Sequence, residues 1–317
     1  MFIKAASTIS YQRTFRNPGF SATLKPLTTQ SELLAPDYSG FIAAMDRRRM
    51  TDIQKMSITC AMDCLDQSGI KQPDAIIVGT SMGCSVNIKT FLDKILEAGE
   101  GPLSPTSFIV STHNTVAGQI ALLLKNHGYN MTYTQNTLSF EQALIDAMIS
   151  CDDSMKNVLV GGADEEENAI YNMHGRLGDN SALLTSGASF FLVSNRKEAG
   201  AVRIVDVGSF GWVEDNGHTV NQFLQANNTT IDEVDLTLFA IDGKQNELPN
   251  LLPGKLIDYQ QFAGTYYTSS AFAMHYAFDI LLTQLHSNHG DHVKTILVYN
   301  NLLPENLGLI LLTSKTD

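Results

Sequence analysis

Short apolar segments alternate with longer amphipathic segments along most of this chain. Each apolar run is too short for a helix and is bounded by turn residues, so it predicts a buried strand. The predicted strands span residues 74–79, 129–133, 158–160, 189–193, 202–207, 236–241, 295–299 and 309–312. The predicted helices span residues 46–68, 86–96, 115–126, 139–150 and 269–286. This alternation predicts βαβ units, an α/β fold and a mainly parallel sheet.

Single residues mark several ends of these elements. Thr51 is a suitable N-cap for the first long helix, and Gly69 is suited to end it. Ser139 is well placed as the N-cap of a later helix. The glycines at 161–162 are expected to end the strand before them. A charged joint at 195–200 separates a complete first half from a compact second half, which suits a duplicated, layered α/β architecture.

Charge and hydropathy exclude several classes of function. The 317 residues carry a formal net charge of −12, and phosphate binding needs a basic surface, so nucleic acid is not expected as a partner. No apolar run reaches the roughly 18 residues of a membrane span. The N-terminal stretch MFIKAASTISYQRTF lacks the long apolar core of a signal peptide. A cytoplasmic protein is therefore expected.

One basic cluster interrupts this acidic sequence. Arg47, Arg48 and Arg49 are consecutive, and Lys55 follows two helical turns further on. The plainer interpretation is a solvated approach to the helix. The alternative interpretation is a docking surface for an acidic partner.

Cysteine and histidine spacing gives no metal site. Cys60 and Cys64 share a helix face, but no second pair of ligands lies near them. All four cysteines are expected to be small buried hydrophobes. His286, His289 and His292 are spaced like metal ligands, although a polar loop rich in His and Asn is the commoner case. No metal and no cofactor is expected.

Four segments carry a family resemblance, and their order is as informative as their content. They are MDRRRMTDIQKMSITCAMDCLDQSGI, IIVGTSMGC, NVLVGGADE and SGASFFLVSNRKEAGAVRIVDVGSFG. In this order they resemble the β-ketoacyl-acyl-carrier-protein synthases. Within that group, SPTSFIVSTHNTVAGQIAL and SFEQALIDA most resemble the shortened ketosynthase-like proteins of bacterial aryl-polyene and flexirubin clusters. Several of those are regarded as chain-length-factor-like partners of a true ketosynthase.

The resemblance implies a thiolase-like, duplicated layered fold of the type α/β/α/β/α. Residues 1–200 would form the N-terminal half and residues 201–317 a shortened C-terminal half. The partners that it implies are an active ketosynthase subunit, a second copy of the chain, or an acyl carrier protein. In this fold the strand at 129–133 usually pairs across the two-fold axis of a dimer, and burying an edge strand has a physical motive.

The catalytic positions of that family are not filled by the expected residues. The cysteine of the condensing enzymes corresponds to Thr137, or to Gln135 if the alignment slips by two residues. Gln135 has two equal interpretations: it is an ordinary turn residue, or it resembles the glutamine that chain-length factors often carry in place of this cysteine. The two family histidines correspond to the turn that begins at Asp242 and to Thr265. A thioester and imidazole assistance are therefore unavailable at these positions.

A remnant apolar pocket is expected beneath this turn. The family's Gly-Phe-Gly-Gly loop is replaced by residues 300–306. Large residues of the last long helix would narrow the pocket; they are Phe272, Met274, Tyr276 and Phe278. The expected border consists of Phe108, His113, Gln135, Thr137, Gly264 and Thr265.

Three hypotheses of function follow. The first is a non-catalytic, chain-length-factor-like subunit of a fatty-acid or polyketide-type system. The second is a 3-oxoacyl synthase or acyltransferase with a displaced nucleophile, Cys84 or Ser139. The third is a structural homodimer without an acyl ligand. Apart from these, His275 is expected to be packed or hydrogen-bonded, and residues 164–167 to form a solvated acidic loop.

Overall fold

The computed structural model describes residues 1–99, 101–153, 155–165, 183–197, 201–241, 251–285 and 293–315. These residues form one ten-stranded mixed sheet with the strand order β3-β2-β4-β5-β1-β6-β10-β9-β7-β8. The strands are β1 (Phe2–Ile9), β2 (Ala75–Gly79), β3 (Tyr129–Tyr133), β4 (Val158–Asp164), β5 (Gly187–Ser194), β6 (Val202–Phe210), β7 (Leu236–Ile241), β8 (Lys255–Asp258), β9 (Thr295–Leu303) and β10 (Asn306–Thr313).

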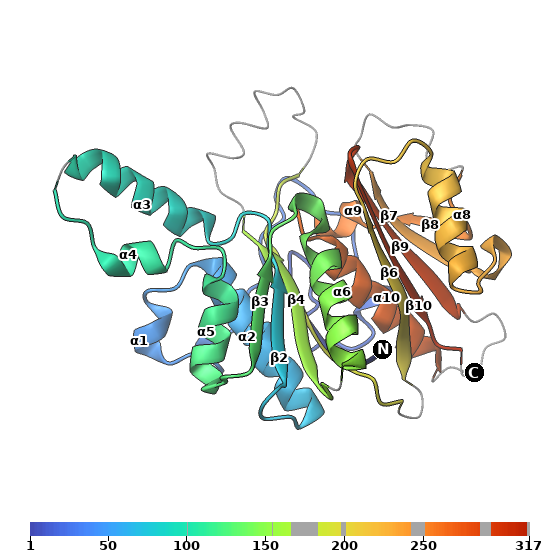
Figure 1. Cartoon of the computed structure of the whole chain (residues 1–317), viewed down its shortest axis with the longest axis horizontal. Coiled ribbons are helices and arrows are strands. Elements are labelled where there is room, and N and C mark those ends of the chain that lie inside the picture. Colours follow the sequence, from blue (N-terminus) through green and yellow to red (C-terminus); the bar gives the residue numbers. More distant parts are fainter. Residues whose placement is uncertain are drawn as a thin grey trace.

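Helices cover the sheet and fill the space between its two ends (Figure 1). The α-helices are α1 (Ala44–Arg47), α2 (Asp52–Ser68), α3 (Ser85–Ala98), α4 (Pro105–Ile109), α5 (Thr115–Leu124), α6 (Ser139–Asp152), α8 (Asn216–Ala226), α9 (Gln260–Ala263) and α10 (Ser270–Leu285). Short 3-10 turns are η1 (Phe20–Ala22), η2 (Tyr38–Gly40), η3 (Asn136–Leu138) and η4 (Ile231–Glu233). None of the helices in the described ranges is long and apolar enough to cross a bilayer.

The strand order repeats once along the sheet. The first five strands run β3-β2-β4-β5-β1, and the last five run β8-β7-β9-β10-β6 from the opposite edge. The two sets meet where Phe2 pairs with Arg203 and Ile3 with Val202. The same order twice is the arrangement that a duplicated fold produces. The division at residue 200 stays a prediction, because the joint itself is only partly described.

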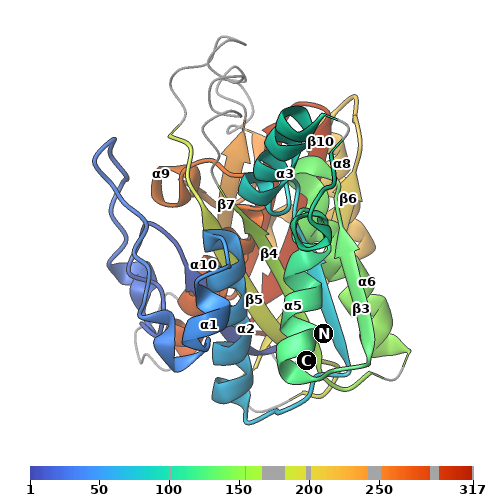
Figure 2. The same cartoon turned by 90° about the vertical axis from the view of Figure 1, so that its left-hand side faces the viewer.

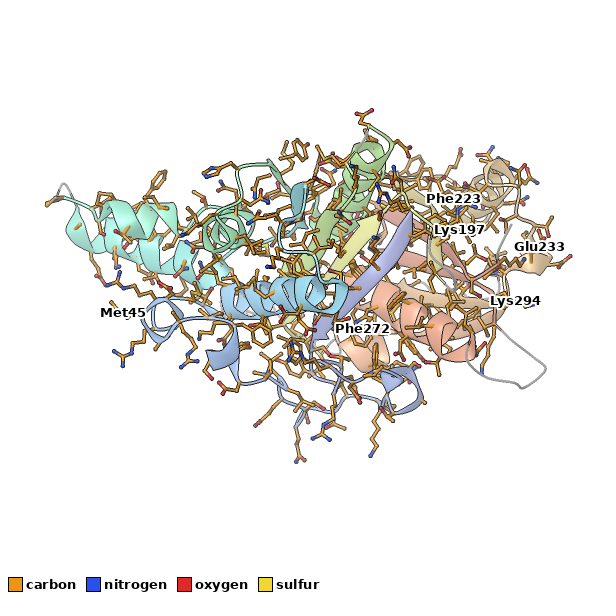
Figure 3. The ribbon with its side chains drawn as sticks, turned by 90° about the horizontal axis from the view of Figure 1, so that it is seen from below. Met45, Lys197, Phe223, Glu233, Phe272 and Lys294 are labelled. Carbon is orange, nitrogen blue, oxygen red and sulfur yellow. The ribbon has the colours of Figure 1, made fainter. Side chains whose placement is uncertain are left out.

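Five layers stack across the molecule. Helices α6 and α10 form the middle layer, since α6 contacts β2, β4 and β6, while α10 contacts β5 and β9. Helix α2 covers β1 and β5 on one outer face. On the other outer face α8 packs Val220 and Leu224 against the buried side of β9 and β10. Figure 3 accordingly shows Phe223 of α8 far from Met45 of α1, with Phe272 of α10 between them.

Strand pairing is parallel only toward the two edges of the sheet. Strand β2 pairs in parallel with β3 and β4, and β7 pairs in parallel with β8 and β9. The central pairs β4–β5, β5–β1, β1–β6, β6–β10 and β10–β9 are antiparallel. The prediction of a mainly parallel sheet is therefore wrong, because the hairpin between β9 and β10 and the long returns to β1 and β6 place antiparallel strands in the centre.

Most element ends agree with the sequence. Gln54 accepts a hydrogen bond from the Thr51 amide (2.9 Å), and Gly69 ends α2 in the left-handed conformation, as predicted. Two predictions are wrong. The helix predicted from residue 46 is divided into α1 and α2, and β4 continues through the glycines at 161–162 to Asp164. A side chain on Gly161 would collide with the Phe190 ring at 2.4 Å, so this glycine allows close packing inside the sheet rather than ending the strand.

Helices α3 and α4 form an arm that projects from the body beside α5 and the β3 edge (Figures 1 and 2). Ser85 is the buried residue of α3, and α4 has no buried residue. Strand β3, by contrast, pairs with β2 on one side and lies at the edge of the sheet on the other. Edge position was predicted for this strand, and that part of the prediction is confirmed.

Candidate functional site

The candidate site is the turn that joins β3 to α6. Asn136 is the strained residue of this turn, with a φ of 47°. Asn tolerates this left-handed conformation better than most residues with a side chain. Asn136 lies between Gln135 and Thr137, the two positions compared with the missing cysteine. Gln135 and Asn136 are exposed, whereas Thr137 is buried, so the turn is a tight elbow that presents amides rather than a thiol.

Ser139 closes this elbow from inside. Its Oγ accepts a hydrogen bond from the Gln135 amide (2.8 Å) and donates one to the Asn136 carbonyl (2.7 Å). Ser139 is the first residue of α6, and Leu138 takes the N-cap position. The prediction that Ser139 is the N-cap is therefore wrong by one residue, because the 3-10 turn η3 precedes the helix and uses the Ser139 hydroxyl.

Thr137 is held by asparagines of the second half. Asn300 Nδ2 donates to the Thr137 carbonyl (2.8 Å), and Asn306 Nδ2 donates to Thr137 Oγ1 (3.1 Å). Asn301 Nδ2 donates to the carbonyls of Leu303 and Asn306, which braces the hairpin between β9 and β10. A hydroxyl needs a neighbouring base to become a nucleophile, and the amide that contacts Thr137 cannot take a proton.

Glu141 is a fully buried acid on the first turn of α6. Asn300 Nδ2 donates to its Oε1 (2.8 Å). Burial raises the pKa of Glu141 to about 7, although the bond from Asn300 opposes this shift. Ser270 of α10 faces the carboxyl group, but Glu141 Oε2 and Ser270 Oγ make no hydrogen bond to the described residues. With a pKa of about 7, the carboxyl group is only partly ionised near neutral pH, and the side-chain amide of Asn300 holds it.

Gly264 and Thr265 lie against the chain that leads into β5. Gly264 has a φ of 71°, and a Cβ there would come within 2.3 Å of the Thr185 methyl group, so the position requires glycine. The Thr265 amide donates to the Leu183 carbonyl (2.8 Å), and the Thr185 amide donates to the Thr265 carbonyl (3.1 Å). Thr265 thus serves as a backbone bridge. That it shares a pocket with the α6 turn stays a prediction.

Phe108 and His113 are both exposed. Phe108 lies on α4 with 56% of its surface exposed, and its ring neighbour is Phe91 at 5.7 Å. His113 is exposed, and its backbone packs against Gly83. Because α4 belongs to the projecting arm, the role of Phe108 and His113 as borders of a pocket stays a prediction. Asp242 lies outside the described residues.

The two alternative nucleophiles are both buried. Burial, with a smaller contribution from the charge of Glu165, raises the pKa of the Cys84 thiol to about 12. Such a thiol is protonated at neutral pH. The Ser139 hydroxyl makes both of the hydrogen bonds that close the elbow. All four cysteines are buried and free, as predicted, and His275 Nδ1 lies 2.7 Å from Thr8 Oγ1, so the prediction for His275 is confirmed.

The acidic pair at the end of β4, Asp164 and Glu165, is not solvated. Asp164 and Glu165 are buried, so the prediction of a solvated loop is wrong for them; residues 166–167 lie outside the described part of the chain. Asp164 Oδ1 accepts hydrogen bonds from the amides of Ser81 and Met82 (2.9 and 3.0 Å). The pair buries its charge because backbone amides at turns and helix starts replace water.

The basic cluster lies at the end of α1. Arg48 and Arg49 are exposed there, and Arg47 is half-buried. Lys55 forms an ion pair with Asp52 one turn away (3.1 Å), so it does not add a free charge to the cluster. The described residues contain no group of three or more His, Cys, Asp or Glu that could hold a metal ion; the histidines at 286–292 fall outside them.

Glu141, Asn136 and the asparagine pair Asn300 and Asn306 were not singled out as site residues from the sequence. A usable sign existed for Glu141, which lies three residues before Leu144 at the border of the apolar stripe of its helix. The asparagines follow a strongly apolar strand, and such amides commonly bond to backbone groups. Their partner could not be known, because it lies on the other half of the chain.

Comparisons with known proteins agree with this architecture. Residues 24–196 match the family described as "Beta-ketoacyl synthase, N-terminal domain". No curated protein matches the chain. The structure "The ishigamide ketosynthase/chain length factor" is 16% identical, with a TM-score of 0.78 and 98% of each chain covered.

Two further solved structures are similar over the same length. A ketosynthase (ApeO) in complex with its chain length factor (ApeC) from Xenorhabdus doucetiae is 11% identical, with a TM-score of 0.77; the match covers 98% of this chain and 97% of that one. A type II polyketide synthase acyl-carrier protein in complex with its ketosynthase bound to the hexaketide, AntDE:AntF, is 12% identical, with a TM-score of 0.78 and 98% of each chain covered. At these identities the similarity shows the thiolase-like ketosynthase fold. With the sequence match over residues 24–196, it follows that this chain belongs to the β-ketoacyl synthase family.

Proposed function

We propose that this chain is a non-catalytic, chain-length-factor-like subunit that pairs with an active ketosynthase in a fatty-acid or polyketide-type system. The observation that carries the proposal is the closed elbow before α6. Thr137 is buried and held by Asn300 and Asn306, and no thiol stands in the turn. Ser139 and Cys84 do not replace it, because the first is engaged in the turn and the second is a buried thiol with a raised pKa.

The surface for the partner is the end of the molecule that carries the arm, α5 and β3 (Figure 2). More than half of the exposed large hydrophobic residues of the described chain lie here. They are Val86, Leu92, Leu96, Leu103, Phe108, Ile109, Leu122, Leu123 and Met131. A patch of this kind marks an interaction surface, and the unpaired edge of β3 beside it offers backbone groups for a continuous sheet. A second thiolase-fold subunit supplies both an apolar face and an edge strand.

Several finer features belong to the same proposal. The chain is cytoplasmic, its two halves divide at residue 200, and its system makes a polyene or polyketide-type product. Arg47, Arg48 and Arg49 form a docking surface for an acyl carrier protein, with Lys55 as a minor contributor. Gln135, Thr137, Gly264 and Thr265 border a narrow acyl pocket, to which Phe108 and His113 contribute only if the arm meets the partner.

The test is condensation by the isolated chain. The purified protein is incubated with a radiolabelled malonyl donor and an acyl-loaded carrier protein, and product is measured against a blank. The expected result is no turnover. Turnover that is abolished by Cys84→Ser or Ser139→Ala would instead establish an enzyme with a displaced nucleophile. Purification of the tagged chain from its own host then separates a complex with a Cys-His-His ketosynthase from a homodimer.

A further inference from the structure

The arm comprises α3, α4 and their connection, and its described residues, 85–99 and 101–110, form no core of their own. Beyond Ser85 none of the residues of α3 is buried, and α4 buries none. Two contacts join its helices to each other: the Phe91 and Phe108 rings lie 5.7 Å apart, and Lys94 Nζ donates to Ser107 Oγ (3.0 Å). The arm is thus a hairpin of helices with internal links, and its direction depends on how its root is fixed to the body.

Glu165 is the side chain of the body that reaches this root. Its Oε1 accepts a hydrogen bond from the Val86 amide in the first turn of α3 (3.2 Å). Its Oε2 accepts one from the Ile53 amide in the first turn of α2 (3.2 Å). The first-turn amides of a helix have no partner within the helix, so one carboxylate satisfies donors of two helices at once.

The two helices joined in this way differ in rigidity. Helix α2 is packed into the body over most of its length, and its residues Ile53, Met56 and Cys60 have no exposed surface. Helix α3, by contrast, buries only Ser85 and is not packed into the body. The carboxylate therefore ties an unsupported helix to a firmly packed one, which gives the arm a fixed reference.

Other contacts also fix the root of the arm, where α3 leaves the body. Asp164, next to Glu165, holds the turn before α3 through the amides of Ser81 and Met82 and also accepts from the Thr268 amide ahead of α10 (3.2 Å). Just before α3, Gly83 has a φ of 57°, and a Cβ there would lie 3.0 Å from the Cα of His113, which follows α4 on the returning segment. The outgoing and incoming segments are therefore in contact.

We infer that Glu165 is the positioning residue of the arm: its carboxylate fixes the direction in which the apolar side chains of α3 and α4 meet a partner subunit. The identity of the partner in this inference rests on the proposed function. The claim that Glu165 fixes the arm does not depend on that function. A surface that is ordered before binding loses less conformational entropy on association. Removing the bridge should loosen α3 without disturbing the sheet.

Substitutions at this position separate its possible roles. Glu165→Gln keeps the length and one acceptor oxygen but turns an NH2 group toward one of the two amides. Glu165→Asp keeps the charge but is too short to bridge both helices. Glu165→Ala removes both acceptors. Glu97→Gln, on the exposed face of α3, and Glu141→Gln, buried in the middle layer, serve as matched controls for charge and for burial.

The test is hydrogen–deuterium exchange of the whole chain at pH 8, above the pKa of about 7 that burial gives Glu165. We expect the α3 amides to exchange about tenfold faster in Glu165→Gln and Glu165→Asp, and faster still in Glu165→Ala, because a buried bond to a charged group is lost. Strand β5 should exchange as before, and neither control should change α3. Unchanged α3 exchange in all three variants, or equal loss of protection in α3 and β5, would overturn the inference.

Association with the ketosynthase partner provides the second measurement. Glu165→Gln should lower the association rate constant several-fold relative to Glu214→Gln, an exposed substitution in the second half, as a less ordered surface binds more slowly. Equal rates for the two variants, with faster α3 exchange, would show that the bridge has no role in recognition and would overturn that part. If the wild-type chain binds no ketosynthase, the proposed function fails, while the exchange experiment still decides whether Glu165 fixes the arm.

Discussion

The two halves of this molecule share a strand order but connect equivalent strands differently. In the first half, the chain between β2 and β3 runs from residue 80 to residue 128 and contains α3, α4 and α5. In the second half, the equivalent connection between β7 and β8 runs only from residue 242 to residue 254. The longer connection of the first half carries many exposed apolar side chains, whereas the equivalent connection of the second half is short. The comparison teaches that the proposed partner surface is an addition to a repeated sheet rather than a property of the sheet.

The second half contributes to the site in another way. Its hairpin between β9 and β10 brings Asn300 and Asn306 to the elbow of the first half. The equivalent hairpin position in the first half, between β4 and β5, is not fully described. The site is thus assembled from both halves, with the backbone elbow from one and the side-chain donors from the other.

The largest expected effect separates the apolar surfaces of the two halves. Leu96 on the arm is 81% exposed, and Leu251 in the second half is 61% exposed. Leu96→Asp should weaken partner binding by about 2 kcal/mol or more, because a charge would enter a desolvated contact. Leu251→Asp should leave binding unchanged. Sedimentation velocity of the complex measures both; equal losses would mean that the partner does not distinguish the halves.

The contribution of the second half to the elbow is tested at Asn300. Asn300→Ala removes the donors to the Thr137 carbonyl and to Glu141 Oε1, and all three groups are buried. The free energy of unfolding should fall by about 2–4 kcal/mol, because two buried acceptors lose their partner. Asn17→Ala, which loses a surface bond to the Arg13 carbonyl, should cost under about 0.5 kcal/mol in the same urea titration. If Asn300→Ala lowers the free energy of unfolding no more than Asn17→Ala does, the claim that the asparagines hold the elbow is wrong.

Ionisation of Glu141 gives an effect that depends on pH. Burial raises its pKa from 4.5 to about 7, so the folded chain keeps a proton that the unfolded chain has lost. The contribution of Glu141 to the free energy of unfolding should therefore fall as the pH rises from about 4.5 to about 7 and then become constant. Glu141→Gln should remove about 1–3 kcal/mol of this fall. Urea titrations at pH 5 and pH 8 give the difference, and Glu97→Gln should keep the wild-type dependence.

Asp164 and Glu165 add to the same slope. Burial raises their pKa values to about 6 and about 7, so their contributions have the same sign as that of Glu141. His275 contributes the opposite slope below about pH 6.5, because burial lowers its pKa from 6.5 to about 4. The burial of each carboxyl group is therefore tested by the difference in slope between the wild type and its amide variant, and a variant that keeps the wild-type slope would contradict it.

The smallest expected effect concerns the elbow backbone. Asn136 has a left-handed φ of 47°. Asn136→Ala should cost about 1 kcal/mol of stability, whereas Asn136→Gly should be nearly neutral, because only glycine adopts this conformation without strain. Thermal unfolding of the two variants measures the difference. An alanine variant as stable as the glycine variant would show that the elbow is relaxed.

Local patterns predicted most of the elements but not their neighbours. The run YNMTY gave β3 with its observed bounds, and Thr51 and Gly69 marked the ends of α2. Periodicity depends on residues close in sequence, and these elements are set by such residues. The antiparallel centre of the sheet could not be predicted in this way, since it depends on the return of β1 and β6 to the middle.

The sequence predicted the location of the site but not the interactions of its residues. The turn before α6 and the absence of a thiol were evident from residues 133–137. The buried state of Glu141, Asp164 and Glu165 was not, because each is stabilised by groups more than a hundred residues away or by backbone amides of other helices. Long-range partners of polar residues leave little trace in a single sequence.

The most direct test of the central claim is the intact mass of each subunit after the purified complex has been incubated with an acyl donor. A non-catalytic subunit beside an active ketosynthase predicts an acyl mass increase on the partner and none on this chain. Replacing the partner's cysteine with alanine should abolish all labelling. An acyl group on this chain that persists in that variant and disappears with Cys84→Ser or Ser139→Ala would contradict the account.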